Sequence, residues 1–357
     1  MDFMMTFKTL FNSALTATML VTLSSPALAE RLSVKEWGQS FEKSLTKDSK
    51  KALQLLDFKR LERQAVPNCV DCSVKGKIQK ARELFAKGQY DQSLALYNQV
   101  PRGTDYWFEA IEEKGWSYFR KNEVEKALAQ TKTLLSPQFS EVVSTEAFFL
   151  QALSNLKVCD YKGVFETTQL FKEKQKNRLL AVQELGEEGF SKAFLKFLEK
   201  VDQLPLKVSD LDDSMVAMPV LFHKDITLQK EMLRFKVSQK AMDILRQRGS
   251  HPTLQSELDQ VNRKSFAAMK QRLQQLAQQE SDFNHKILQK LSLVEVEAIQ
   301  RMHADLELDA SLFAKSKFKK TSVDELVFMD DGRPWIDELD KYEVIAKKCP
   351  DNIRRKM

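Results

Sequence analysis

The sequence predicts an all-α protein, and three observations support this fold class. Only 10 glycines and 9 prolines occur in 357 residues, so few positions interrupt a helix. Apolar residues recur three or four positions apart along most of the chain, which is the spacing of a helix face. From Thr253 to Asp331 neither glycine nor proline occurs. Charged residues at 30% and hydrophobic residues at 43% fit a soluble, helix-rich protein.

Residues 1–29 are expected to be a secretory signal peptide. Lys8 precedes an apolar run from Leu10 to Leu23, and Ala27-Leu28-Ala29 fits the small-residue pattern that signal peptidase cleaves. An uncleaved anchor is the alternative, although the apolar run is short for a membrane span. After cleavage we expect a periplasmic or secreted protein with no integral membrane span.

Residues 30–75 are expected to form capping helices that lead into a Cys-x-x-Cys loop. Val34, Trp37 and Phe41 lie three or four positions apart, as on one face of a helix. Such helices would cover the outer apolar edge of the region that follows. Cys69-Val70-Asp71-Cys72 comes directly after a proline and an asparagine, which favours a loop.

Residues 76–204 contain a pattern that recurs 34 and then 37 positions further on. It consists of a small residue, a turn residue and the first residue of a second helix. The small residues are Ala81, Gly115 and Ala152, the turn residues are Gly88, Asn122 and Cys159, and the second helices begin at Tyr90, Val124 and Tyr161. A period of about 34 residues with these positions in register predicts helix–turn–helix repeats.

This pattern resembles the tetratricopeptide repeat (TPR) family. With the signal peptide, the long helices and the stretch Trp335-Ile336-Asp337-Glu338-Leu339, the chain is similar to envelope TPR proteins of Gram-negative bacteria. The resemblance implies stacked helix pairs, with a concave groove lined by the first helix of each pair. It also implies a scaffold that binds another envelope protein or a peptide.

The groove implied by the resemblance has eight candidate residues for binding a partner. They are Lys75, Gln79, Arg82, Glu112, Trp116, Phe119, Phe149 and Leu153. A free carboxyl terminus is disfavoured as the ligand, because Ile78 and Glu112 stand where carboxylate-binding members of the family have basic or asparagine residues. Two outcomes stay open. The groove takes a peptide or helix of the partner, or the later helices of the same chain fill it.

Residues 205–312 are expected to form a long antiparallel helical hairpin. Gly249-Ser250-His251-Pro252 is a strong break between two helical stretches. The second stretch carries an imperfect heptad seam, which needs a partner helix. Its residues are Met269, Leu273, Leu276, Phe283, Ile287, Val294 and Ala298. An intramolecular partner is favoured, and a coiled-coil dimer is the alternative, so the chain is expected to be a monomer or a homodimer.

Residues 313–357 are expected to be a C-terminal segment with two basic clusters and a small β element. Asp331-Gly332 is a turn signal between the β-prone runs Val323–Met329 and Tyr342–Ala346. Pro334 disturbs the register of any tight hairpin there.

The four cysteines are expected to form structural disulfides after export. Three pairings are open, and the favoured one joins Cys69 to Cys72 and Cys159 to Cys349. A zinc site would need a second cysteine or histidine pair, and the four histidines do not cluster, so we expect no metal and no cofactor.

The function predicted from the sequence is that of a non-enzymatic periplasmic scaffold or adaptor for protein–protein interactions. No phosphate-binding glycine loop or nucleophile motif occurs. Basic and acidic residues interleave, which argues against nucleic acid as the partner. One alternative is a structural protein that self-associates through its long helix. Another is a redox or peptidoglycan-associated factor that uses the Cys-x-x-Cys pair.

Overall fold

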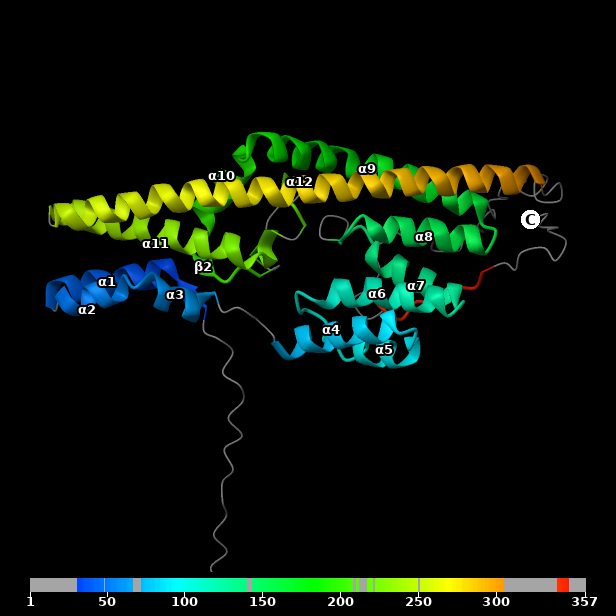
Figure 1. Cartoon of the computed structure of the whole chain (residues 1–357), viewed down its shortest axis with the longest axis horizontal. Helices are drawn as coiled ribbons and strands as arrows, with labels where there is room; N and C mark the ends of the chain where they lie inside the picture. Colours follow the sequence, from blue (N-terminus) through cyan, green and yellow to red (C-terminus); the bar gives the residue numbers. More distant parts are fainter. Residues whose placement is uncertain are drawn as a thin grey trace, which may run out of the picture. The chain divides into compact units, whose positions relative to one another are not determined.

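The computed structural model is all-α, which confirms the predicted fold class (Figure 1). None of the helices in the described part of the chain combines the length and the apolar character that a membrane span requires. The predicted signal peptide lies outside that part. The structure describes residues 31–47, 49–66, 72–139, 143–207, 210–211, 217–220, 222–249, 251–304 and 339–346.

The N-terminal helices pack against later parts of the chain. Trp37 and Phe41, from the predicted apolar face, are buried and stack with ring centroids 5.2 Å apart. Asp57 caps the third of these helices by accepting from Arg60 N at 3.2 Å. The elements are β1 (Leu32–Ser33), α1 (Val34–Lys47), α2 (Ser49–Leu55) and α3 (Phe58–Ala65).

A two-stranded sheet joins the start of the described chain to residues far along the sequence. β1 pairs antiparallel with β2 (Gln203–Leu204). Asp202 accepts from Ser33 Oγ at 2.7 Å and from Lys35 N at 2.9 Å, and thereby caps α1. A β element was expected near the C-terminus instead. Of that element only Tyr342–Ala346 is described, and it carries no strand.

Three consecutive helix pairs follow, each closed by a left-handed turn residue. The backbone φ is 74° at Gly88, 67° at Asn122 and 60° at Cys159. Glycine and asparagine adopt this conformation most readily, which is why they suit such turns. These are the three positions that were predicted as turns from the sequence. The pairs are α4 (Cys72–Ala86) with α5 (Tyr90–Tyr97), α6 (Trp107–Arg120) with α7 (Val124–Leu134), and α8 (Glu146–Lys157) with α9 (Tyr161–Glu188).

Small residues let these helices approach closely. Ser93 is buried, and its Oγ donates to the carbonyl oxygen of Ala81 at 2.8 Å, across the first pair. A Cβ atom added to Gly115 would lie 2.7 Å from Leu150 Cδ2, so α6 and α8 leave no room there for a side chain. Ala81 and Gly115 are two of the small residues of the pattern found in the sequence. Ser93 and Leu150 lie on the helices that pack against them.

The later helices form the second part of the fold (Figure 1). α11 and the first half of α12 run antiparallel. Asn262 donates to the carbonyl oxygen of Phe235 at 3.1 Å, and ten residues later Arg272 Nη2 bonds Asp225 at 2.6 Å. The second half of α12 packs on α8 and α9. The elements are α10 (Lys192–Lys200), the 3₁₀ helix η3 (Phe222–Lys224), α11 (Ile226–Arg248) and the 53-residue α12 (Pro252–Ala304).

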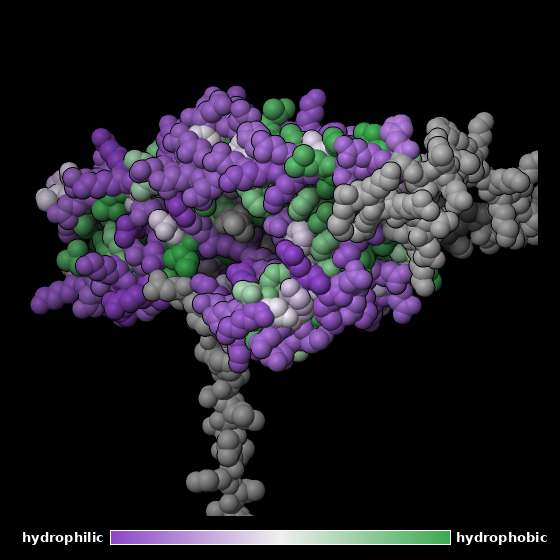
Figure 2. All heavy atoms as spheres, turned by 45° about the vertical axis from the view of Figure 1, so that its right-hand side comes forward, coloured by the Kyte–Doolittle hydropathy of each residue, from purple (hydrophilic) through white to green (hydrophobic). Residues whose placement is uncertain are grey.

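The buried face of α12 belongs to two different apolar clusters along its length. Its residues up to Ala277 belong to an apolar cluster with α1, α3, α10 and α11, whereas residues from Ile287 onward belong to one with α8 and α9. Glu280 and the buried Asn284 lie between the two clusters. Outside these cores, hydrophilic side chains dominate the face seen in Figure 2, and hydrophobic ones reach it in patches.

An ion pair closes this polar layer. Arg178 of α9 is 2% exposed and pairs with Glu280. Arg178 Nη2 also donates to the carbonyl oxygen of Met218 at 3.2 Å, and Glu280 Oε2 accepts from Val220 N at 2.6 Å. The pair therefore holds α9, α12 and the segment before η3 together.

The close approach of α6 and α8 gives a stability prediction. Gly115→Val should destabilise the protein by about 1–3 kcal/mol, because its side chain would overpack against the fully buried Leu150. Gly76→Val in α4 is the matched control, since nothing lies within 4 Å of a Cβ atom there, and it should change stability by less than about 0.5 kcal/mol. Urea unfolding curves of the two variants measure this. Equal midpoints would contradict the packing described here.

Candidate functional site

The face formed by α4, α6 and α8 brings three of the predicted groove residues together. The ring centroid of Trp116 lies 5.9 Å from that of Phe119 and 5.8 Å from that of Phe149. All three side chains are half-buried. We call these three residues the aromatic cluster. Leu153 is also half-buried and lies one helical turn after Phe149.

Two lysines lie over rings of the aromatic cluster. Lys157 Nζ is 4.6 Å from the centroid of Phe119, and Lys290 Nζ is 5.1 Å from that of Phe149. Such contacts are attractive because the ring face carries negative charge density. Lys290 comes from α12, so a later helix of the chain reaches the edge of this face while the aromatic side chains keep part of their surface exposed.

Arg82 joins α4 to two carboxylates of α6. Its Nη2 lies 2.8 Å from Glu109 Oε2 and 2.5 Å from Glu113 Oε1. The hydroxyl of Tyr97 donates to Glu113 at 2.6 Å, and Lys224 of η3 bonds Glu109 at 2.8 Å. Burial, and then the bond to Glu113, raise the pKa of Tyr97. Glu109 and Glu113 are therefore both compensated by positive charge.

Glu112 stands in a different environment from its neighbours. Burial raises the pKa of its carboxyl well above the usual value, and the negative charges of Glu146, Glu113 and Glu109 raise it further. Burial also raises the pKa of Glu146, against the opposing effect of Lys290. A carboxyl group that retains its proton can donate a hydrogen bond to a ligand.

The indole of Trp116 adds a second polar group to this face. Its Nε1 is buried and has no partner in hydrogen-bonding geometry. It lies close enough to Glu146 to favour the charged form of that carboxyl. Glu112 and Trp116 are four residues apart in α6, so both groups project from one side of the helix.

The remaining groove predictions fall outside this constellation. Lys75 and Gln79 are exposed on α4, and Arg82 engages Glu109 and Glu113 rather than Glu112.

Several residues of the site were not predicted from the sequence. A signal was present in α6, where glutamates at positions i, i+3 and i+4 share one face. No such signal exists for Lys224 and Lys290, because they lie far along the chain from α6 and α8. The missed residues are Tyr97, Glu113, Glu146, Lys157, Lys224 and Lys290.

The cysteines are described only in part. Cys69 and Cys349 lie outside the described residues, and Cys72 is the first residue of α4. Cys159 occupies the turn between α8 and α9 and is disulfide-bonded. Its partner is not among the described side chains, so the favoured pairing stays a prediction.

The heptad seam of α12 is largely covered within the chain. Phe283 is 36% exposed, and the other six seam residues are buried against neighbouring helices. A different stripe of apolar side chains on α12 faces outward. It comprises Leu288, Leu293, Val296 and Ile299, of which Leu293 is the most exposed at 69%.

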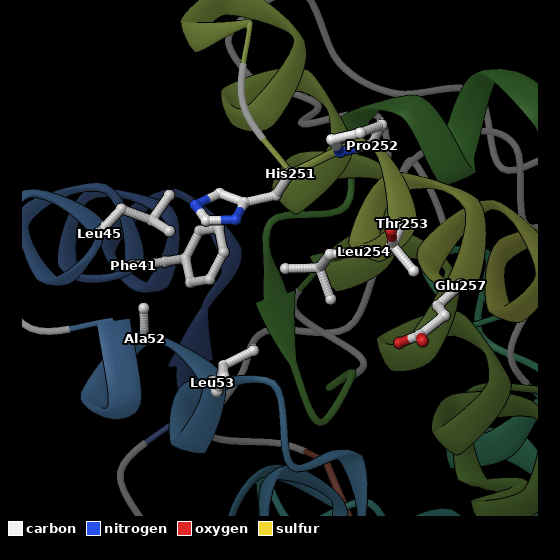
Figure 3. A pocket seen from close by; sticks show the side chains of 9 residues that line it. All are labelled: Phe41, Leu45, Ala52, Leu53, His251, Pro252, Thr253, Leu254 and Glu257. Carbon is white, nitrogen blue, oxygen red and sulfur yellow. The ribbon is translucent and has the colours of Figure 1, made fainter.

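A pocket of about 490 Å³ lies between α1, α2 and the start of α12 (Figure 3). The imidazole of His251 and the side chain of Leu45 lie beside the ring of Phe41. Glu257 stands at the other side with Thr253. The lining is largely apolar and offers few convergent polar groups, so it has less recognition chemistry than the face of α4, α6 and α8.

Metal-binding side chains do not gather in the described part of the chain. No group of three histidine, cysteine, aspartate or glutamate side chains there is placed to hold an ion. His223 is buried, and burial, followed by the charge of Lys224, lowers its pKa to about 4. Its ring is therefore neutral near pH 7.

Comparison with known proteins gives no evidence on function, so function is inferred from the geometry of the site. No protein-family model, curated protein or solved structure matches the chain. The chemistry of the site is accordingly argued from its own side chains, of which the aromatic cluster and Glu112 offer the most to a ligand.

The environment of Glu112 predicts a pH-dependent effect on stability. Its folded pKa lies above the ordinary value of 4.5, so its contribution is favourable below that pH and is lost as pH rises through the folded pKa. Glu112→Gln should therefore stabilise the protein at pH 8, by about 1.4 kcal/mol for each unit of the shift, and much less at pH 4. Melting temperatures across this pH range measure the effect.

A second substitution serves as the control for this experiment. Glu83→Gln, at an exposed position of α4, should show no such trend with pH. If Glu112→Gln and wild type gave parallel melting temperatures at all pH values, the environment described for Glu112 would be contradicted.

Proposed function

We propose that the chain is a non-enzymatic adaptor of the cell envelope that binds a segment of another protein on the face of α4, α6 and α8. The half-exposed aromatic cluster carries this proposal. Half-buried tryptophan and phenylalanine side chains supply large apolar contact areas at little cost in conformational entropy, and they are typical anchors of protein interfaces. The partner segment is an extended peptide or a helix laid along this face.

The polar groups around the aromatic cluster support selective binding of one partner over nonspecific apolar association. Arg82 is held by Glu109 and Glu113, yet its side chain remains 52% exposed. The raised pKa of Glu112 favours the protonated form of its carboxyl, which can donate a hydrogen bond. A partner that accepts this hydrogen bond beside an apolar contact gains both affinity and register.

The TPR character of the helix pairs is part of the proposal. Two features of the structure support it. Left-handed turns at Gly88, Asn122 and Cys159 recur 34 and 37 residues apart, and small residues stand at the close contacts of Ala81 with Ser93 and of Gly115 with Leu150.

Export to the periplasm is likewise proposed. The signal-peptide pattern of residues 1–29 supports it, and so does the disulfide at Cys159, because such bonds persist in oxidising compartments.

Site-specific photo-crosslinking in the native host tests the adaptor proposal. With p-benzoyl-phenylalanine in place of Gln79 on α4, we expect a discrete covalent adduct with one envelope protein. The matched control replaces Gln92, which is equally exposed but lies on α5. Trp116→Ala, checked for an intact melting transition, should reduce the adduct at least about tenfold, since an aromatic anchor contributes about 2 kcal/mol or more. Adducts of equal yield from both positions, unaffected by Trp116→Ala, would refute it.

Self-association through α12 is the second candidate function, and the outward apolar stripe favours it. Two glutamates between Leu288 and Gln300 are paired, Glu295 with Lys172 and Glu297 with Arg301. A stripe of exposed leucine, valine and isoleucine is unusual on a solvated helix.

Light scattering at tens of micromolar measures this second function. A dimer mass is expected for wild type and for the control Gln279→Lys, and a monomer mass for Leu293→Lys, because a buried unpaired lysine disfavours the contact. A monomeric wild type would eliminate self-association as the function.

A further inference from the structure

A C-terminal strap, residues 339–346, lies against α6 and α7 (Figure 1, red). Within these described residues the strap forms no helix or strand, and half-buried residues alternate with exposed ones from Asp340 to Ala346. Ile345, one of the outward residues, is 94% exposed. This alternation is typical of an extended segment laid on a surface, with every second side chain turned toward it.

The first two residues of the strap fill a recess that is built by three parts of the helix pairs. Leu339 is 6% exposed and belongs to the apolar cluster of α4 to α8. Its carbonyl oxygen accepts from Arg102, which lies between α5 and α6. Asp340 Oδ1 accepts from Lys114 Nζ of α6 at 2.8 Å, and Asp340 N donates to Thr133 of α7 at 3.1 Å. The recess thus contacts an apolar side chain, a carboxylate and two backbone groups of the strap.

Lys114 makes this recess require an acidic side chain. Lys114 is 5% exposed, and among the described residues Asp340 is the one acidic side chain that pairs with it. A buried ammonium group without a partner is strongly unfavourable, so an anion has to be supplied wherever this lysine is buried. That anion comes from a segment 226 positions further along the chain. The helix pairs alone therefore do not complete the recess.

The rest of the strap is held by side chains of α7. Tyr342 lies under Lys132, 4.8 Å from Nζ to the ring centroid, and Ala346 N donates to Glu125 at 3.0 Å. In the described part of the chain, no backbone-to-backbone hydrogen bond joins the strap to the helices. Contacts of this kind depend on a short pattern of residue types, so a segment of another protein with the same pattern can reproduce them.

The recess lies on a different side of α6 from the aromatic cluster. Lys114 follows Glu112 by two residues, which places it about 200° further around the helix axis. Thr133 and Lys132, which also contact the strap, belong to α7, whereas the aromatic cluster belongs to the face of α4, α6 and α8. Binding at the recess is therefore independent of the binding face proposed above.

We propose that the recess of Arg102, Lys114 and Thr133 is a second docking site, which binds an extended segment of a partner protein. In that segment an apolar residue precedes an aspartate, and an aromatic residue follows two positions later, as in the strap. The strap is a ligand from the same chain that competes for the recess. It lowers the apparent affinity for the partner segment by the fraction of molecules in which the recess is open.

Binding of a labelled peptide to the full-length protein tests this proposal. The probe is Leu-Asp-Lys-Tyr-Glu-Val-Ile-Ala with blocked termini, the sequence of the strap. Asp340→Asn removes the anion of the strap, and asparagine also suits the left-handed backbone at this position, where φ is 67°. In fluorescence anisotropy the probe should bind Asp340→Asn at least about tenfold more tightly than wild type, because the competing strap is weakened. Equal affinities would overturn the proposal.

Two further variants guard against an effect of Asp340→Asn on folding. Tyr342→Ala loosens the strap without removing the partner of Lys114, and it should also increase the affinity for the probe. Glu343→Gln changes an exposed position of the strap and is the matched control, so the affinity should equal that of wild type. A Tyr342→Ala protein that binds no more tightly than Glu343→Gln would contradict competition by the strap.

A second peptide tests whether the recess recognises the anion. The same peptide with asparagine at its second position should bind the Asp340→Asn protein at least about tenfold more weakly than the probe, because it brings no charge to Lys114. Equal binding of the two peptides would refute recognition of an acidic residue.

Light scattering tests a second copy of the chain as the alternative source of the segment. The proposal predicts the same molecular mass for wild type and for Asp340→Asn. A wild-type dimer that dissociates in Asp340→Asn would mean that the strap of one copy fills the recess of another, and it would overturn the assignment to a partner protein.

Discussion

The structure depends on the buried pair of Arg178 and Glu280. Taking both charges out of water is costly, and their attraction offsets that cost only when the geometry and the surrounding hydrogen bonds are good. Here the carbonyl of Met218 and the amide of Val220 each supply one hydrogen bond, whereas Nε and Nη1 of Arg178 have no hydrogen-bond partner in the described part of the chain. If α12 slid by one turn so that Glu280 took the position of Leu276, its carboxylate would enter an apolar cluster without its arginine. The pair therefore selects a single register for a helix of 53 residues.

The register of α12 determines which of its side chains lie at the candidate site. One turn beyond Glu280, Asn284 accepts from Thr145 just before α8, at 2.7 Å. Further along the same helix, Lys290 lies over Phe149 and opposes the rise in the pKa of Glu146. The electrostatic environment of the aromatic cluster is thus set by a contact made elsewhere on α12. Glu280 lies outside the aromatic cluster, yet the register it selects sets the position of Lys290 over Phe149.

The sequence predicted those features of the fold that depend on local residue preferences alone. Turns at Gly88 and Asn122 follow from backbone preference, and α12 follows from the absence of helix breakers. The contacts of Lys224 and Lys290 were not predictable, since they join residues more than 100 positions apart that share no pattern. The heptad seam illustrates the limit most clearly. Apolar spacing shows that a helix needs a neighbour, but it does not say which helix, or which chain, provides one.

The unbroken length of α12 has a mechanical consequence. Its first turn forms a wall of the pocket beside Phe41, and its later turns carry Lys290 to the aromatic cluster. An α-helix of this length extends about 80 Å and resists stretching, because every turn is closed by hydrogen bonds along the axis. The wall of the pocket and Lys290 therefore belong to one continuous helix, and their separation along its axis is fixed by the geometry of that helix.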